Sequence, residues 1–317
     1  MKKPVYILLA LTAFFACSAA YAQIPAQPTF PRGEGVNLRI LDDNVWDYSK
    51  DVIPESWKGL PADPRDPERS KGFARLIGDY LPDVLTFQEY SNHMHEYLFP
   101  KIEGWGYVYA RPAEELRKNN TPIFYNTHTM ELVEVNYHLY TPRQWSNSDS
   151  KSYSSAVFIH KASGRYVAVI TTHLWWKSEK AQVGSDMARA SQAALVCAHA
   201  GLLQSRYDCP VFITGDMNAR EETLAIQMYF KAGYKPCYKL ATEFADNHTG
   251  HHNCFPNSGY SRDFDTAHPT REAGAIDHCL LKDPNGIVEI RRFDCVMDEY
   301  TVPLTDHYPN IIDAVVK

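Results

Sequence analysis

Residues 211–218 read VFITGDMN, and this stretch decides the fold. Its apolar start predicts a short buried strand, and Gly215 then begins a turn that carries Asp216 and Asn218. A Gly-Asp turn after a strand usually indicates no more than a turn. In α/β sheets, however, the ends of strands are where ligand sites are built. Whether this turn belongs to a site therefore depends on what the other strand ends carry.

Polar side chains stand at the ends of several other apolar stretches. These residues, spread over most of the chain, are Asn44, Glu89, His173, Asp277, Asp306 and His307. Carboxylate and amide oxygens suit a hard divalent cation such as Mg²⁺ or Mn²⁺, which binds substrate phosphate while keeping some of its waters. Each residue alone is a weak signal, because a lone histidine or loop carboxylate is more often structural. The recurrence of the pattern is what indicates chemistry.

Hydrophobic patterning predicts more strands than helices. The expected strands are residues 38–41, 83–87, 105–110, 122–126, 131–140, 154–160, 165–172, 210–214, 275–281, 288–297 and 310–316. The expected helices are residues 69–80, 185–206 and 221–231, with long loops at 47–68 and 235–274. No repeat or change in composition divides the chain, so one large α/β domain with mixed sheets is expected.

The composition excludes several classes of protein. The chain has 317 residues, of which 44% are hydrophobic and 22% charged, which rules out a disordered chain, a collagen-like fibre and a coiled coil. The net charge of −6 gives no overall attraction to a polyanion. A local basic groove for nucleic acid remains compatible with it.

The first 22 residues resemble a secretory signal peptide. Lys2 and Lys3 precede an apolar run at 5–16, and Ala20-Tyr21-Ala22 supplies a small-residue cleavage site. Cleavage there would leave 295 residues, and loss of the two lysines would change the net charge from −6 to −8. We therefore expect an exported protein, periplasmic or secreted, with an extended lead-in at 23–36 and a single domain at 37–317. No other stretch is long enough for a membrane span.

Two alternatives to this processing stay open. The apolar run could remain as an uncleaved anchor, although it is short for a membrane span. Cleavage before Cys17 would make a lipoprotein, but Phe14 stands where a small or leucine-like residue is needed.

The cysteines do not define a site. Six would remain after cleavage: Cys197, Cys209, Cys237, Cys254, Cys279 and Cys295. A Cys237–Cys254 bridge is one option in an oxidising compartment, and buried free thiols are the other. The absence of a CxxC pair gives no support to a structural zinc site.

The ordered polar segments resemble the endonuclease/exonuclease/phosphatase superfamily of metal-dependent phosphoesterases, in an exported bacterial-type form. The segments are Asn44-Val45-Trp46, Phe87-Gln88-Glu89, Thr172-His173-Leu174, Gly215-Asp216-Met217-Asn218, Ile276-Asp277-His278 and Thr305-Asp306-His307-Tyr308-Pro309. The resemblance covers residues 37–316. It implies a four-layer α/β sandwich, in which two mixed, mainly antiparallel β-sheets carry helices on the outside.

The resemblance also implies a role for each residue. Glu89 would be the principal metal ligand, with Asn44 and Asp306 close to the metal, which would be Mg²⁺ or, as an alternative, Mn²⁺. Asp216 would orient or deprotonate the attacking water, and Asn218 would fix the water and the phosphate. His307, held by Asp277, and His173 would bind the phosphate. These roles fit phosphate ester hydrolysis, which needs a placed water, a positive clamp and help for the leaving oxygen.

Weaker candidates for substrate contact lie near these segments. They are Lys151, Trp175, Trp176, Lys177 and Arg189. The tryptophans could form a platform for a base, sugar or lipid headgroup, or could pack in the core. The charged residues could bind anionic groups or simply face solvent.

The expected function is metal-dependent hydrolysis of a phosphodiester, as by a phosphodiesterase or nuclease. The alternatives are a phosphomonoesterase acting on inositol or sugar phosphates, a sphingomyelinase-like lipid phosphodiesterase and a catalytically inactive binding protein. The partner would be a phosphate ester in nucleic acid, a lipid headgroup or a small molecule, bound by a monomer.

Overall fold

The computed structural model describes residues 29–46, 67–112, 121–140, 151–244, 275–296, 298, 300–301, 304–305 and 307–317. The predicted signal peptide, Cys17, Cys254 and Asp306 lie outside the described residues. Predictions that concern them are therefore not addressed by the fold.

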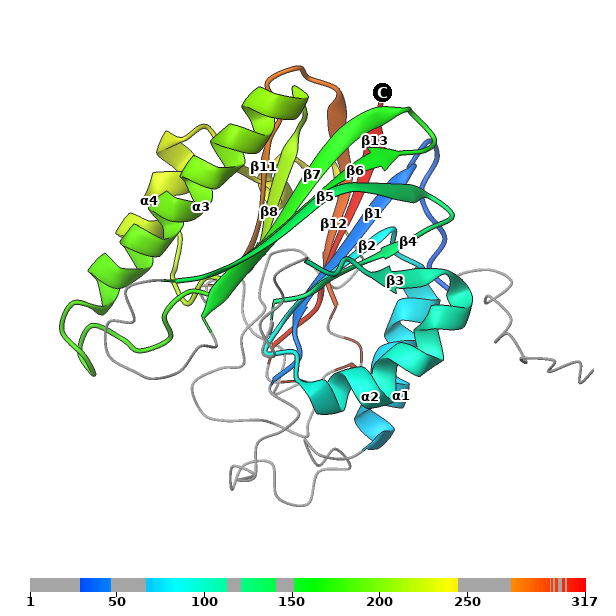
Figure 1. Cartoon of the computed structure of the whole chain (residues 1–317), viewed down its shortest axis with the longest axis horizontal. Helices are drawn as coiled ribbons and strands as arrows, with labels where there is room; N and C mark the ends of the chain where they lie inside the picture. Colours follow the sequence, from blue (N-terminus) through cyan, green and yellow to red (C-terminus); the bar gives the residue numbers. More distant parts are fainter. Residues whose placement is uncertain are drawn as a thin grey trace, which may run out of the picture.

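Two mixed β-sheets form the centre of the molecule (Figure 1). Within the described residues, one sheet has seven strands in the order β10 (Glu243–Phe244), β12 (Val288–Cys295), β13 (Asn310–Val316), β1 (Leu38–Asn44), β2 (Val84–Gln88), β4 (Ile123–Asn126) and β3 (Tyr107–Tyr109). The other described sheet has six, in the order β5 (Met130–Leu139), β6 (Ser152–His160), β7 (Arg165–Thr172), β8 (Val211–Asp216), β11 (Asp277–Lys282) and β9 (Lys235–Pro236).

Most neighbouring strands run antiparallel. The parallel pairs among the described strands are β1–β2, β7–β8 and β10–β12. The first two of these pairs matter for function, because parallel neighbours end at the same edge of their sheet. Asn44 thus pairs with Gln88 at the end of β1 and β2, and Thr171 pairs with Thr214 near the end of β7 and β8.

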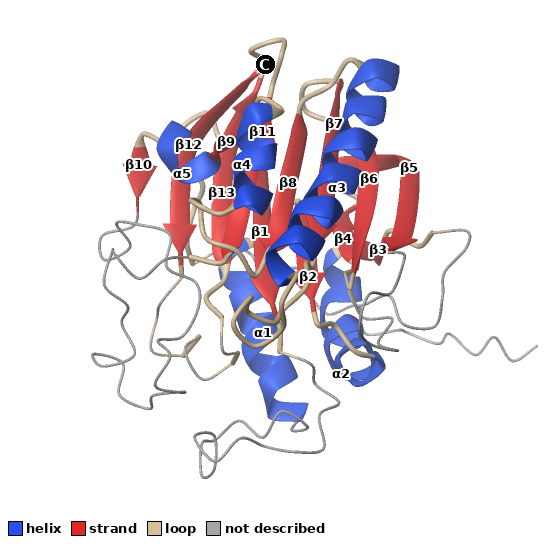
Figure 2. Cartoon of the chain, turned by 90° about the vertical axis from the view of Figure 1, so that its left-hand side faces the viewer, coloured by secondary structure: helices blue, strands red, loops and turns tan. Residues whose placement is uncertain are grey.

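Helices cover the outer face of each sheet. The sheet of seven strands packs against α1 (Pro67–Tyr80) and α2 (Asn92–Ile102), and the sheet of six packs against α3 (Ser185–Tyr207) and α4 (Leu224–Lys231). Figure 2 shows α3 and α4 lying in front of the strands of the second sheet. This arrangement confirms the predicted four-layer sandwich.

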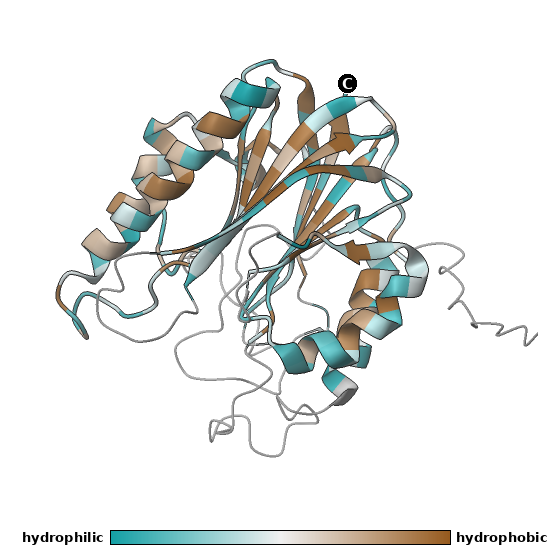
Figure 3. Cartoon of the chain, viewed as in Figure 1, coloured by the Kyte–Doolittle hydropathy of each residue, from teal (hydrophilic) through white to brown (hydrophobic). Residues whose placement is uncertain are grey.

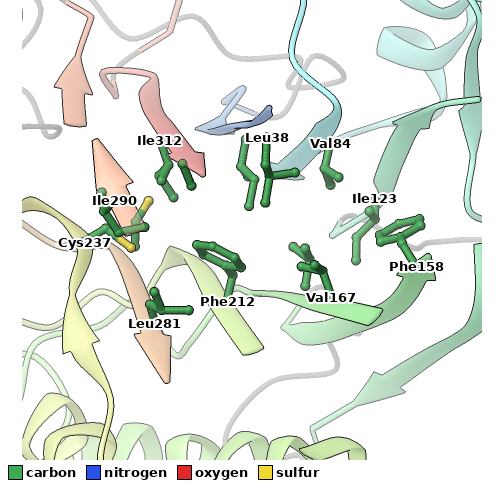
Figure 4. Packing of buried hydrophobic residues seen from close by; sticks show 14 of the residues in the cluster. Leu38, Val84, Ile123, Phe158, Val167, Phe212, Cys237, Leu281, Ile290 and Ile312 are labelled. Carbon is green, nitrogen blue, oxygen red and sulfur yellow. The ribbon is translucent and has the colours of Figure 1, made fainter. Parts of the chain in front are cut away.

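Apolar side chains from both sheets fill the space between them. Figure 4 shows Leu38, Val84 and Ile312 of the first sheet facing Phe212 and Val167 of the second. The strands are correspondingly rich in hydrophobic residues (Figure 3). Burial of such surface gives about 25 cal/mol per Å², which makes this layer a main source of stability.

The inner face of β1 changes character along its length. Alternate residues of a strand share a face, so Leu38 and Ile40 are followed on the same face by Asp42 and then Asn44. All four are buried. The sheets therefore enclose an apolar core at one end and polar side chains at the other, where the candidate site lies.

Some elements differ from the sequence-based expectation. Helix α2 was not expected, although Ser91 caps it by accepting a hydrogen bond from the amide of Met94 at 3.2 Å. Its buried side chains, Met94, Leu98 and Ile102, recur every four residues. The predicted loop at 235–274 begins with β9, the short helix α5 (Cys237–Leu240) and β10.

Among the described residues, Cys197, Cys209, Cys237, Cys279 and Cys295 are free thiols. The described part of the chain contains no helix that combines the length and apolar character needed to span a membrane.

Candidate active site

The site forms where strand ends of the two sheets meet. Asn44 at the end of β1 donates from Nδ2 to Oδ2 of Asp216 at the end of β8, at 3.0 Å. The Asn44 side chain is fixed from its other end, because Oδ1 accepts a hydrogen bond from the amide of Trp46 at 3.0 Å. Both residues are buried. The first predicted segment and the VFITGDMN stretch are thus joined directly.

Gly215 allows β8 to approach β7 closely. Its φ is +129°, and a Cβ atom at this position would lie 2.0 Å from the carbonyl oxygen of Thr172. Only glycine fits such a contact. This close approach places Asp216 beside His173, the first residue after β7.

Two of the candidate residues adopt left-handed backbone conformations. Glu89 has a φ of 54° and Asn218 a φ of 48°. Non-glycine residues rarely adopt such angles, and they gather at functional sites. For Asn218 the turn is held by Asp216, whose Oδ1 accepts the Asn218 amide at 2.9 Å. The Asn218 side chain donates to the carbonyl of Leu174 at 3.2 Å.

Two histidines flank Asp216. Nε2 of His173 lies 3.2 Å from Oδ2 of Asp216, and Nε2 of His307 lies 3.9 Å from the same oxygen. Nδ1 of His307 is hydrogen-bonded to Oδ2 of Asp277 at 2.7 Å. Nε2 of His173 also contacts Nζ of Lys151. The structure therefore brings together His173, Asp216, Asp277 and His307, four residues selected from the sequence.

Burial and charge shift the ionisation of this group in opposite directions. Burial favours a neutral Asp216, but the charges of His173 and His307 outweigh it and hold the pKa of Asp216 well below its usual range. Burial, reinforced by the charge of Asp216, raises the pKa of Asp277 to about 7 although His307 opposes this. Burial and the nearby Lys151 lower the pKa of His173. Carboxylates with separated pKa values are typical of catalytic sites.

Asp216, Asp277 and His307 could hold a metal ion. Each offers a ligand atom, and these atoms lie within 4.8 Å of one another. Oxygen donors with one imidazole fit a hard or borderline divalent cation. Glu89 directly follows β2, and it lies close enough to His173 for its negative charge to oppose part of the lowering of the His173 pKa. Asp216, Asp277 and His307 thus form a possible site for a divalent cation, and this group does not include the predicted ligands Glu89 and Asn44.

A buried polar layer supports the site and was missed by the sequence interpretation. We use this term for Asp42, Thr86, Gln88, Thr171 and Thr214. Thr86 and Gln88 donate to Oδ1 of Asp42 at 2.7 and 2.9 Å. Thr214 donates to Thr86 at 2.9 Å and Gln88 donates to Thr171 at 2.9 Å, so both bonds join the two sheets. Polar residues in the alternating positions of apolar strands were the available signal.

The candidate substrate contacts separate into two groups. Trp175 and Arg189 are buried, and Nη1 of Arg189 donates to the carbonyls of Trp175 at 3.0 Å and Lys177 at 2.6 Å. These two residues hold the loop after β7. Trp176 is exposed, and Nζ of Lys177 lies 5.4 Å from its ring centroid. Lys151 is the candidate that touches a residue of the site, His173.

The chain is thus a four-layer α/β sandwich with a buried Asp–His group at its strand ends. The model of the Endonuclease/Exonuclease/phosphatase family matches residues 56–307. The chain therefore belongs to this family, which is generally dependent on divalent metals. No curated protein sequence matches the chain significantly.

Solved structures show the same fold at low sequence identity. A mannosyl-6-phosphatase from Bacteroides thetaiotaomicron has a TM-score of 0.64 and 17% identity, over 88% of this chain and 99% of that one. The catalytic domain of human Nocturnin with bound sulfate has a TM-score of 0.62 and 17% identity, over 92% and 100%. A family protein from Bacteroides thetaiotaomicron has a TM-score of 0.64 and 16% identity, over 88% and 95%.

Proposed function

We propose that the protein is a divalent-metal-dependent hydrolase of phosphate esters, acting on a phosphodiester. The observation that carries this proposal is the surrounding of Asp216. One buried carboxylate, kept anionic at neutral pH, accepts a hydrogen bond from Asn44 and faces two histidines. Such an arrangement can position a water molecule against a phosphate whose oxygens the histidines contact.

The residues divide the reaction between them. Asp216 accepts a hydrogen bond from the attacking water and directs its lone pair toward phosphorus, and Asn218 helps to fix the water and the phosphate. His307 is oriented by the bond between its Nδ1 and Asp277, which leaves Nε2 for a phosphate oxygen. His173, with Lys151 beside it, supplies a second contact near the same oxygen of Asp216. Developing negative charge on the phosphate oxygens is thereby stabilised by preorganised donors.

The proposed metal, Mg²⁺ or alternatively Mn²⁺, would be held by Glu89 with Asn44 and Asp306 nearby. When bound, a divalent cation supplies positive charge to the phosphate oxygens and to the attacking or leaving oxygen. Asp216 and Asp277 approach the same region from the second sheet. The charge of Asp216 helps to raise the pKa of Asp277, so a cation bound beside both carboxylates would relieve this repulsion.

A second candidate function is hydrolysis of a sugar phosphate monoester. It is favoured by the similarity in fold to the mannosyl-6-phosphatase. A nuclease is the less favoured form of the diesterase, because a net charge of −6 does not provide the several phosphate contacts of nonspecific DNA binding.

The test is hydrolysis of bis-p-nitrophenyl phosphate, with p-nitrophenyl phosphate as the monoester. We expect Mg²⁺-dependent turnover of the diester, its loss in EDTA, and a decrease of about three orders of magnitude in kcat/KM for Asp216→Asn and His307→Ala. Glu222→Gln, an exposed carboxylate on the loop before α4, is the matched control.

Three other results of these assays would contradict the proposal or favour one of its alternatives. Full activity in EDTA would exclude the metal-dependent mechanism. Turnover of the monoester alone would favour the second candidate. No turnover with any divalent metal would favour a binding protein on this scaffold.

We also propose that the protein is exported, with cleavage after Ala22 and a single domain at 37–317 that acts as a monomer. Amino-terminal sequencing of the mature protein should find Gln23 first, whereas an acylated Cys17 would support the lipoprotein alternative. Size-exclusion chromatography with light scattering tests the monomer.

A further inference from the structure

We propose that Trp176 is a stacking platform for a sugar ring, so that the phosphate ester bound at the site is a simple sugar phosphate, neither a nucleotide nor a lipid. This inference rests on the proposed hydrolysis of phosphate esters, and it names the group that the ester carries in either the diester or the monoester form of that function. Trp176 is 58% exposed, although the loop that contains it is held by many hydrogen bonds.

The backbone on both sides of Trp176 is fixed by one side chain. Arg189 is only 5% exposed, and its guanidinium donates to the carbonyls of Trp175 and Lys177, at 3.0 and 2.6 Å. It also pairs with Asp186 one turn earlier in α3. A buried guanidinium bound to the carbonyls before and after Trp176 leaves that residue little backbone freedom.

Neighbouring bonds hold the rest of the loop. The Trp175 amide donates to Oε1 of Gln192 at 2.8 Å, and its Nε1 donates to Oγ of Ser185 at 3.2 Å. The Glu179 carboxylate accepts the amides of Gly184 and Asp186 at 2.7 and 2.9 Å. Ligand binding to a loop already ordered costs less conformational entropy. Trp176 is therefore presented as a rigid surface, although an indole of this size is usually buried.

The platform lies next to the reacting groups. Leu174, two residues earlier, donates its amide to the Asp216 carbonyl at 2.9 Å and accepts the Asn218 side chain at 3.2 Å. Consecutive Cα atoms are about 3.8 Å apart, so the Cα atom of Trp176 lies within about 8 Å of that of Leu174. We infer that the ring of a sugar phosphate held at the site extends as far as this loop.

The chemistry around Trp176 favours a sugar. An indole face attracts C–H groups, because its quadrupole is negative above the ring. Nζ of Lys177 lies over one face of the Trp176 ring, 5.4 Å from its centroid. A sugar stacked on the other face would have a hydroxyl donor close to the ring edge in this ammonium group. A polynucleotide would instead need a row of cations for its phosphates, and an acyl chain has no hydroxyl for Lys177 to bind.

Isothermal titration calorimetry can test the inference. The titrated protein is the Asp216→Asn variant with Mg²⁺, because this variant is expected not to hydrolyse the ligand during the measurement. The ligands are glucose 6-phosphate, adenosine 5′-monophosphate, dihexanoyl phosphatidic acid and inorganic phosphate. We expect glucose 6-phosphate to bind about tenfold more tightly than inorganic phosphate, at the lower end of the range for ring stacking. Adding Trp176→Ala should remove most of this advantage, whereas Trp176→Phe should keep most of it.

Val183→Ser is the matched control, since Val183 is an exposed apolar residue of the same loop with 84% exposure. It should retain the tenfold preference. Three results would overturn the inference: no preference in the parent protein, a preference that survives Trp176→Ala, or an equal or larger Trp176-dependent gain for the nucleotide or the lipid. Binding is measured without turnover, so failure of the proposed hydrolysis would be seen separately in the p-nitrophenyl assays.

Discussion

At the scale of the residue, the site is built from positions that tolerate few side chains. Gly215 is required because a Cβ atom at this position would collide with the Thr172 carbonyl. The close approach of β8 to β7 that glycine allows brings His173 beside Asp216. Asp42 is a different case. Its Oδ1 is satisfied by Thr86 and Gln88, but Oδ2 has no hydrogen-bond partner among the described residues. Burial raises the pKa of Asp42 to about 6.

Asp42→Asn should make folding less sensitive to pH. Burial raises the pKa of Asp42 to about 6 in the folded protein, whereas in the unfolded chain the pKa returns to 3.8, the ordinary value for an aspartate. The stability that the proton on Asp42 contributes is complete below the lower value and is lost as pH rises through the higher one. We expect Asp42→Asn to match wild type at pH 4 and to exceed it by about 3 kcal/mol at pH 7.5.

Urea denaturation in EDTA at the two pH values measures this difference. Glu222→Gln is the control, because its exposed side chain should give the same small change at both. A stability difference for Asp42→Asn that does not depend on pH would show that folding does not raise the pKa of Asp42.

At the scale of the element, α3 organises the loop that follows β7. Arg189, Gln192 and Ser185 all lie on α3, and all three bind Trp175 or its neighbour Lys177. The helix thus does more than cover its sheet. It sets the position of the loop that continues from His173, and the buried side of the helix carries the polar groups that do so.

Arg189→Lys should loosen this loop while α3 remains folded. Lysine keeps the charge but lacks the planar fork that reaches several acceptors at once. We expect a loss of about 1–3 kcal/mol in the free energy of unfolding, since buried acceptors lose their donor. Hydrogen exchange should become faster at residues 175–177.

Arg206→Lys is the matched control on the same helix, where the exposed Arg206 pairs with Glu134 at 2.7 Å. Exposed ion pairs contribute little, so a change below about 1 kcal/mol is expected. Equal effects of the two substitutions would contradict the special role of Arg189.

At the scale of the whole molecule, the site belongs to neither sheet alone. Asn44 and Glu89 come from strands of the first sheet, whereas Asp216 and Asp277 pair with each other in the second. The hydrogen bond between the Asn44 and Asp216 side chains joins the two sheets directly. A cation bound between these groups would therefore link the two halves of the sandwich and stabilise the molecule as a whole.

Metal binding should raise the melting temperature. At a free Mg²⁺ concentration of about 100 times Kd, the folded state gains about 2.7 kcal/mol, which corresponds to about 5 °C or more for a chain of this size. Differential scanning fluorimetry with and without EDTA measures the shift. Glu89→Gln should abolish it, and Glu131→Gln, an exposed carboxylate of β5, should retain it. An undiminished shift in Glu89→Gln would show that the cation binds elsewhere.

The sequence alone was enough to select His173, Asp216, Asp277 and His307 and to predict one α/β domain with mixed sheets, and the family that its polar segments resemble implied the four-layer sandwich. Strand periodicity and turn chemistry are local properties, so they can be recognised along the chain. Helix α2 was missed because its apolar spacing is short and Pro100 interrupts the usual helical composition.

Only the tertiary structure decided what the remaining side chains do. The sequence left open whether Arg189 and Trp175 contact substrate, and in the structure both are buried and bound within the loop that contains Trp176. The polar layer around Asp42 depends on hydrogen bonds between strands far apart in the sequence. Burial, exposure and the resulting pKa shifts arise from contacts between distant segments, and no local pattern contains them.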